Sequence, residues 1–117
     1  MTALAGRPFN PILPAMKQSP VSRTRTLAEL KALEGELRAR GLRSLYLFGS
    51  TARGDSGPDG DVDLFAEFEP NARLGWDFAG VPELMMRHLT RRVDFTTRDA
   101  LHPLLRADIE GEAIRVF

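Results

Sequence analysis

Apolar residues recur along this chain in blocks whose spacing alternates between helical and strand-like. In the first block leucines return every three or four residues, at Leu27, Leu30, Leu33 and Leu37. This spacing is typical of a helix with one buried face. Thr26 and Glu29 stand in the order of a capping box, and Gly41 is a suitable stop. The pattern predicts a helix from Thr26 to about Gly41.

Three shorter blocks predict strands. The first, Leu45–Phe48, is a continuous apolar run that Gly49 ends. The second, Asp61–Phe68, alternates, with Val62, Leu64, Ala66 and Phe68 on one side and Asp61, Asp63, Phe65 and Glu67 on the other. The third, Val93–Thr97, is rich in β-branched and aromatic residues.

Two further blocks have helical spacing. Around Trp76–Leu89, with Pro82 at a first turn or a kink, one face would hold Val81, Leu84, Met85, His88 and Leu89. We therefore expect His88 to be a core or interface histidine. Pro103–Ala113 predicts a last helix, with Leu101, Leu105 and Ile109 inward, before a short edge strand in Ile114–Phe117. This order predicts an α/β (α+β) fold, a small mixed β-sheet flanked by helices.

Residues 1–25 differ in composition from the rest. They contain four prolines and four basic residues but no carboxylate, and proline at this density opposes both helix interiors and central strands. We interpret residues 1–25 as a flexible arm and residues 26–117 as the folded domain. The alternative is an extended arm that lies on a partner or on the domain through Phe9, Ile12 and Leu13.

The bulk composition narrows the classes of function. A chain of 117 residues suits one domain. A formal net charge of +0 creates no field that would attract nucleic acid or an anionic membrane. No apolar run has the roughly 18 residues of a membrane span, and without cysteine there are no disulfides or thiolate metal ligands. We expect a soluble, cytoplasmic protein without direct nucleic-acid or membrane contacts.

Four aspartates crowd together after a glycine-rich turn: Asp55, Asp59, Asp61 and Asp63. The surrounding sequence does not match a trypsin-like nucleophile loop, because both histidines lie downstream. It lacks the glycine and the final glutamate of a calcium loop and the Gly-Lys-Ser/Thr of a Walker A loop. Clustered carboxylates raise one another's pKa unless a cation lies among them, so the cluster indicates a metal site.

Strand geometry adds a third carboxylate to this site. Asp61 and Asp63 are two residues apart, so they point to the same face of their strand. Val93 and Phe95 are expected to face the core, which turns the intervening Asp94 the other way. If the two strands are neighbours, the three aspartates meet. Oxygen-only ligation favours two Mg²⁺ ions, with Mn²⁺ as the alternative.

The turn before this cluster has the features of a phosphate site. Gly49 and Ser50 end a strand and begin a helix, where backbone amides and a hydroxyl face an anion. Arg53, one helical turn from Ser50, adds positive charge. We expect this turn to hold the phosphates of a nucleoside triphosphate beside the metal ions.

These segments together resemble a known family. Gly49-Ser50-Thr51-Ala52-Arg53-Gly54, Asp61-Val62-Asp63-Leu64 and Val93-Asp94-Phe95-Thr96 follow one another as in the DNA polymerase β-like nucleotidyltransferases. They are most similar to the minimal nucleotidyltransferases, the antitoxin half of HEPN–MNT toxin–antitoxin pairs. The resemblance covers residues 27–117 and includes the closing segment around Glu110 and Glu112. Gly60 departs from it, because relatives usually have a small polar residue there.

The resemblance implies a chemistry and a partner. Asp61 and Asp63 would bind both metal ions, and Asp94 would bind the catalytic ion and help to deprotonate the attacking hydroxyl. Gly49, Ser50 and Arg53 would hold ATP, and AMP would pass to a tyrosine of a HEPN RNase toxin. The alternative is an inactive module that neutralises its partner by binding alone. Transfer to a small molecule such as an aminoglycoside is a weaker third hypothesis.

Overall fold

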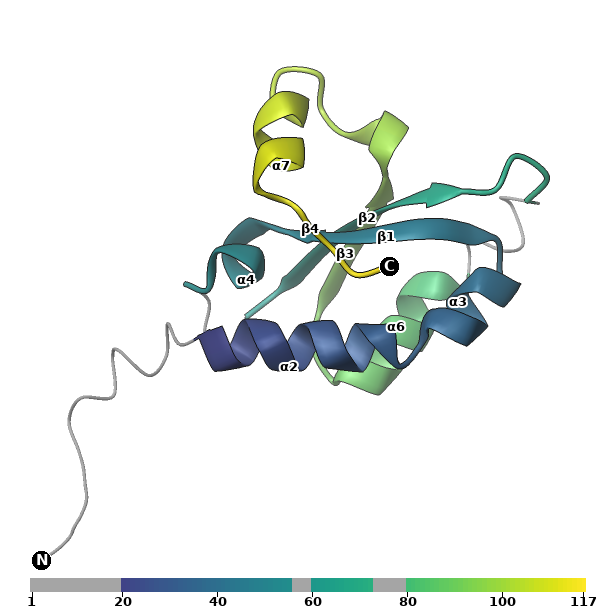
Figure 1. Cartoon of the computed structure of the whole chain (residues 1–117), viewed down its shortest axis with the longest axis horizontal. Coiled ribbons are helices and arrows are strands. Elements are labelled where there is room, and N and C mark those ends of the chain that lie inside the picture. The colour runs from purple at the N-terminus through teal and green to yellow at the C-terminus, as the bar shows by residue number, and fades with distance from the viewer. Residues whose placement is uncertain (1–19, 56–59, 73–79) are drawn as a thin grey trace, which may run out of the picture.

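The computed structural model describes residues 20–55, 60–72 and 80–117, which form a sheet with helices on both of its faces (Figure 1). The elements follow in the order α2 (Pro20–Lys31), α3 (Glu34–Ala39), β1 (Leu42–Phe48), α4 (Gly49–Arg53), β2 (Val62–Phe68), α6 (Val81–Leu89), β3 (Val93–Thr97), η1 (Arg98–Ala100), α7 (Arg106–Glu112) and β4 (Ile114–Arg115). The predicted order of helices and strands is confirmed.

The sheet is mixed, and its strands lie in the order β3-β2-β1-β4. β1 pairs antiparallel with β2 and with β4, whereas β2 and β3 are parallel. A parallel pair needs a crossover connection, and α6 lies in the connection between β2 and β3. The short edge strand predicted in Ile114–Phe117 is β4, which pairs with β1 through Ile114 and Arg115.

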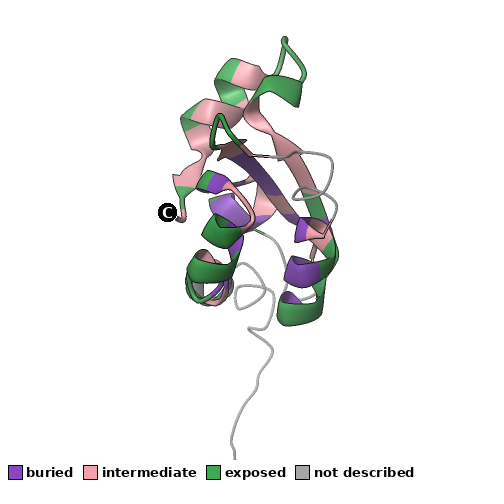
Figure 2. Ribbon diagram, turned by 90° about the vertical axis from the view of Figure 1, so that its right-hand side faces the viewer, coloured by how far each residue is buried: buried purple, intermediate pink, exposed green. Residues whose placement is uncertain are grey.

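The hydrophobic core lies on the face of the sheet that α2, α3 and α6 cover, below the sheet in Figure 1. Leu30, Leu37 and Leu45 are fully buried there, and Figure 2 shows that both the sheet and the helices contain buried segments. β1 begins three residues earlier than predicted. A register shift between Leu42 and Ser44 lets Leu42 join the same core as Leu45.

The opposite face of the sheet carries aromatic rings and charged groups. Phe65 is fully buried there and stacks on Tyr46, with ring centroids 4.8 Å apart. The ring centroid of Phe48 lies 5.7 Å from that of Phe65. The alternation along β2 placed Phe65 on the face of Asp63 and Glu67, and this prediction is confirmed. η1 and α7 lie over this second face (Figure 1).

The predicted start of the first helix is wrong. α2 begins at Pro20, and the helical turn breaks between α2 and α3. Thr26 therefore does not cap a helix, and its buried hydroxyl accepts a hydrogen bond from Arg91 Nη1 at 2.8 Å. Arg23 also belongs to α2 and donates to the carbonyl of Ala52 at 3.1 Å. The arm remains a prediction for residues 1–19, which lie outside the described residues.

Two smaller predictions about the helices need correction. His88 is exposed on α6, although Leu84 and Leu89 are buried as predicted. α7 begins at Arg106, and Leu105 is 53% exposed. The part of the predicted Trp76–Leu89 helix in residues 73–79 lies outside the described residues. Among the described helices, none is long and apolar enough to cross a membrane.

Candidate active site

The end of β1 lies against an acidic side chain of β2. Phe48 pairs with Asp63 across the two strands, and Gly49, the next residue, has φ +75°. A Cβ atom on Gly49 would overlap the carboxylate of Asp63. Glycine is required here for two reasons, the left-handed backbone and the close approach of the acid.

The parallel pairing brings a second acid level with the first. Asp63 of β2 pairs directly with Asp94 of β3, and Asp61 directly precedes β2. Burial raises the pKa of the half-buried Asp63, and the negative charges of Asp94 and then Asp61 raise it further. The three aspartates named from the sequence therefore lie at one end of the β2–β3 pair, where Asp94 and Asp61 act electrostatically on the carboxyl of Asp63.

These acids fit a magnesium or manganese ion in kind, because their donors are carboxylate oxygens. In the ranges 20–55, 60–72 and 80–117, however, no three His, Cys, Asp or Glu side chains are grouped so that they could hold a metal ion. Asp61 Oδ1 lies 3.8 Å from Arg92 Nε, and both side chains are largely exposed. A shared metal site would require the three aspartate side chains to lie closer together than they do here.

The glycine turn and Arg53 are in contact with the C-terminal helix. The amide of Gly49 donates to Glu112 Oε2 at 2.8 Å, and Arg53 Nη1 lies 3.2 Å from Glu112 Oε1. Arg53 also pairs with Asp55, with 3.3 Å between Nε and Oδ2. Hydrogen bonds to Asp55 and Glu112 raise the pKa of Arg53. Ser50 is partly buried in the first turn of α4.

Arg91 fixes the backbone at the entrance to β2, a role that the sequence analysis did not predict. Its Nε donates to the carbonyl of Gly60 at 2.9 Å. The same side chain reaches Thr26 on α2 at 2.8 Å and Thr51 on α4 at 3.4 Å. Thr51 in turn donates to the carbonyl of Asp61 at 3.1 Å. Arg91 therefore ties two helices to the segment that carries Asp61.

Of the residues proposed from the sequence, Gly49, Asp63 and Asp94 come together most closely. Arg53 also acts on Asp63, since its charge lowers the pKa of that carboxyl. Asp59 lies outside the described residues. Glu112 and Arg91 were missed as site residues. Glu112 stood in the closing segment that resembles the family, but nothing local to it indicated a contact with a residue 63 positions earlier.

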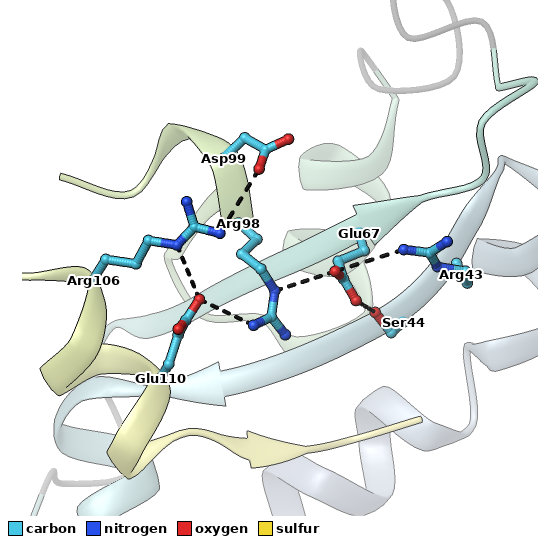
Figure 3. A network of polar contacts seen from close by, with 7 residues as sticks. All are labelled: Arg43, Ser44, Glu67, Arg98, Asp99, Arg106 and Glu110. Carbon is cyan, nitrogen blue, oxygen red and sulfur yellow. Dashed lines mark hydrogen bonds and ion pairs between the residues drawn. The ribbon is translucent and has the colours of Figure 1, made fainter. Parts of the chain in front are cut away.

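A separate charged network occupies the other end of the same sheet face (Figure 3). Glu67 accepts a hydrogen bond from Ser44 Oγ at 2.9 Å and pairs with Arg98 Nε at 3.3 Å. Arg98 Nη1 also pairs with Glu110 Oε2 at 3.0 Å, and the guanidinium lies over the ring of Phe65, 5.1 Å from the centroid. Arg43, Asp99 and Arg106 complete the network. This network fastens η1 and α7 to the sheet.

Comparison with known proteins agrees with the fold. Residues 30–116 match the model of the nucleotidyltransferase domain family. The protein adenylyltransferase MntA of Thermococcus cleftensis is 31% identical over 96 residues, 78% of this chain and 96% of that protein. MJ1379 of Methanocaldococcus jannaschii, an inferred protein adenylyltransferase, is 31% identical over 77 residues, 64% of this chain and 77% of that protein.

Solved structures give the same relationship. An inferred minimal nucleotidyltransferase superposes with a TM-score of 0.60 at 34% identity, over 79% of this chain and 89% of that one. A toxin–antitoxin structure with AMP-PNP, at 20% identity and a TM-score of 0.55, shares the fold over 76% of this chain and 72% of that chain. The predicted polymerase β-like fold is thereby confirmed, and the chain belongs to the nucleotidyltransferase domain family, among its minimal nucleotidyltransferases.

Proposed function

We propose that this protein is a Mg²⁺-dependent protein adenylyltransferase that acts as an antitoxin. It would transfer AMP from ATP to a tyrosine of a partner HEPN RNase toxin and so silence that toxin. The observation that carries the proposal is the cross-strand pair of Asp63 and Asp94 beside the close turn at Gly49. A carboxyl whose pKa is raised by burial and by neighbouring acids, next to a turn with a backbone amide donor, suits a metal–triphosphate ligand.

In this reaction the tyrosine oxygen forms a bond to the α-phosphorus of ATP, and the bond from that phosphorus to the bridging oxygen breaks. Asp94 helps to take the proton of the attacking hydroxyl. Gly49 and Ser50 hold the triphosphate through amide and hydroxyl donors while pyrophosphate leaves, and Arg53 balances its charge. Divalent ions held by Asp61, Asp63 and Asp94 would supply the charge neutralisation that such transfers need.

Two comparisons support the acceptor and the setting. Both curated relatives carry protein adenylyltransferase in their names, which favours a protein over a small molecule as acceptor. The toxin–antitoxin structure was solved with an ATP analogue, which favours ATP as the donor and a toxin as the partner.

The second candidate is a module that neutralises its partner by binding alone. It is favoured because no three acids among the described residues are grouped to hold a metal ion and because Asp61 lies beside Arg92. Glycine at position 60 also lacks the hydroxyl expected beside a nucleotide. Both hypotheses predict a protein complex, but only one predicts transfer of a nucleotide.

One assay separates the two candidates. The chain is incubated with Mg²⁺, α-labelled ATP and a candidate partner, chosen as a small helical protein with an Arg-x₄-His motif that a neighbouring reading frame would encode. The adenylyltransferase predicts label on that partner, lost in Asp61→Asn. Neutralisation of the partner without label, and equally by Asp61→Asn, would favour the binding module.

A partner-independent measurement tests the site itself. Millimolar Mg²⁺ with ATP should raise the melting temperature of the chain, because a ligand that binds only the folded state stabilises it by mass action. No shift at these concentrations would contradict the adenylyltransferase.

A further inference from the structure

The carboxylate of Glu112 binds the same donor groups that the proposed function assigns to the triphosphate. It accepts the amide hydrogen of Gly49 at 2.8 Å and lies 3.2 Å from Arg53 Nη1. An amide hydrogen and a guanidinium are the donors that a phosphate oxygen would use. Both contacts come from α7, which follows the last acid of the site in the chain and is not part of the sequence motif around Gly49.

The positive charge near Gly49 is already balanced by carboxylates, so a further anion beside Glu112 would be repelled. Arg53 is already paired with both Asp55 and Glu112. Glu112 also raises the pKa of Asp63, so its charge acts on the acidic cluster. A triphosphate that approached Gly49 would meet the Glu112 carboxylate at the same donors. Either the carboxylate leaves or the phosphate binds more weakly, because like charges at contact distance repel.

The helix that carries Glu112 is weakly packed. None of the seven residues of α7 is buried, and in the segment before it Leu104 is 85% exposed. Its attachment to the sheet is mainly polar, through Glu110 to Arg98 at 3.0 Å (Figure 3). Segments with few buried apolar contacts open at low free-energy cost. α7 can therefore loosen and release the Glu112 side chain from the turn, while Ile114, two residues later, stays paired with Leu47 of β1.

The geometry points to Glu112 as a latch, an internal anion that holds the Gly49 turn and Arg53 in the free protein and is displaced when the triphosphate binds. This inference rests on the proposed function, since it names the residue that controls entry to the same site. The latch keeps the turn and Arg53 in place before binding, at the expense of nucleotide affinity.

The test compares the affinity for Mg²⁺–AMP-PNP in three chains by calorimetry. Glu112→Gln keeps the size of the side chain and an oxygen acceptor for Gly49 but removes the charge. It should bind about three- to tenfold more tightly than the natural chain. Glu83 is an exposed residue of α6, on the side of the sheet that holds the core. Glu83→Gln removes the same charge away from the turn and should leave the affinity unchanged. Equal or weaker binding by Glu112→Gln would overturn the latch.

A second measurement needs no variant. Hydrogen–deuterium exchange over Arg106–Glu112 in the natural chain should become faster when Mg²⁺–AMP-PNP saturates the site. Unchanged or slower exchange would mean that Glu112 stays in place and positions the bound nucleotide, which contradicts displacement. If the natural chain binds no nucleotide at all, the proposed function fails and the latch with it. Tight binding with protected α7 rejects the latch alone.

Discussion

Two acids on the same face of β2, four residues apart, have opposite surroundings. Glu67 accepts a hydrogen bond from Ser44 and lies within ion-pair distance of Arg43 and Arg98. Among the described residues Asp63 forms no ion pair with an arginine or lysine, and its pKa is raised by burial and then by the charges of Asp94 and Asp61. Both side chains are half-buried on one strand, so the charged groups around them are what sets the two acids apart.

The difference separates a structural acid from a functional one. The charges around Glu67 compensate one another and join η1 and α7 to the sheet. The charges around Asp63 do not compensate one another, and this costs stability in the free protein. Groups kept in an unfavourable environment concentrate at functional sites. The comparison predicts that removing the two charges has opposite effects on folding and very different effects on catalysis.

The largest expected effect is on nucleotide transfer. Asp63→Asn should lower the rate of AMP transfer to the partner about a thousandfold, equivalent to ~4 kcal/mol of transition-state stabilisation. Glu67→Gln, the matched change at the paired acid, should retain a rate within about threefold of the natural chain. Quantified label on the partner under single-turnover conditions measures both. Similar losses in the two variants would remove the distinction between the acids.

The next effect is on the glycine turn. Gly49→Ala should lower the free energy of unfolding by about 2–4 kcal/mol, because alanine is strained at positive φ and its methyl group overlaps Asp63. The control is Gly111→Ala in α7, where an added Cβ meets nothing within 4 Å. It should be neutral or stabilise by about 0.5–1 kcal/mol. Urea unfolding measures both, and a Gly49→Ala chain as stable as the control would contradict the close approach.

Glu67→Gln should then lower the free energy of unfolding by about 1–2 kcal/mol. The change leaves Arg98, whose side chain is only 24% exposed, without one of its two carboxylates. Asp63→Asn should do the reverse and raise the stability of the metal-free chain by roughly 0.5–1 kcal/mol, since it removes a repelled charge. Destabilisation by Asp63→Asn would show that its charge is compensated after all.

The smallest effect is the pH dependence. The pKa of Asp63 is raised in the folded chain, so between the ordinary aspartate pKa of about 3.9 and the raised value the folded state binds more protons than the unfolded state. The contribution of Asp63 is therefore fully favourable below about pH 4 and is lost as the pH rises through the raised pKa. The natural chain should gain stability relative to Asp63→Asn on going from pH 7 toward pH 4.5. Parallel unfolding curves at the two pH values would contradict the shift.

The strands could be predicted because their signals are local. Val93–Thr97 is β3 with the same bounds, and β2 starts one residue after the predicted Asp61. β1 was predicted too short, because Arg43 and Ser44 interrupt the apolar run. Their polar groups meet Glu67 on the neighbouring strand, and no local pattern reveals such a partner.

The same limit applies to the candidate site. Alternation along each strand was enough to place Asp63 and Asp94 on one face, once β2 and β3 were taken as neighbours. The contact of Glu112 with Gly49 joins residues 63 positions apart, and Arg91 reaches Thr26 over 65. Such contacts depend on how the helices pack against the sheet. The prediction that Thr26 caps a helix is wrong for this reason, because its hydroxyl accepts a hydrogen bond from Arg91.

The parallel pairing of β2 with β3 also bears on when the site forms. Antiparallel neighbours can pair from a short turn, but a parallel pair needs a crossover connection, and distant pairings of this kind form slowly. A nascent or partly folded chain thus carries all of its aspartates without an assembled pocket. The chain therefore gains the capacity for chemistry only once β2 and β3 have paired and brought Asp63 and Asp94 together.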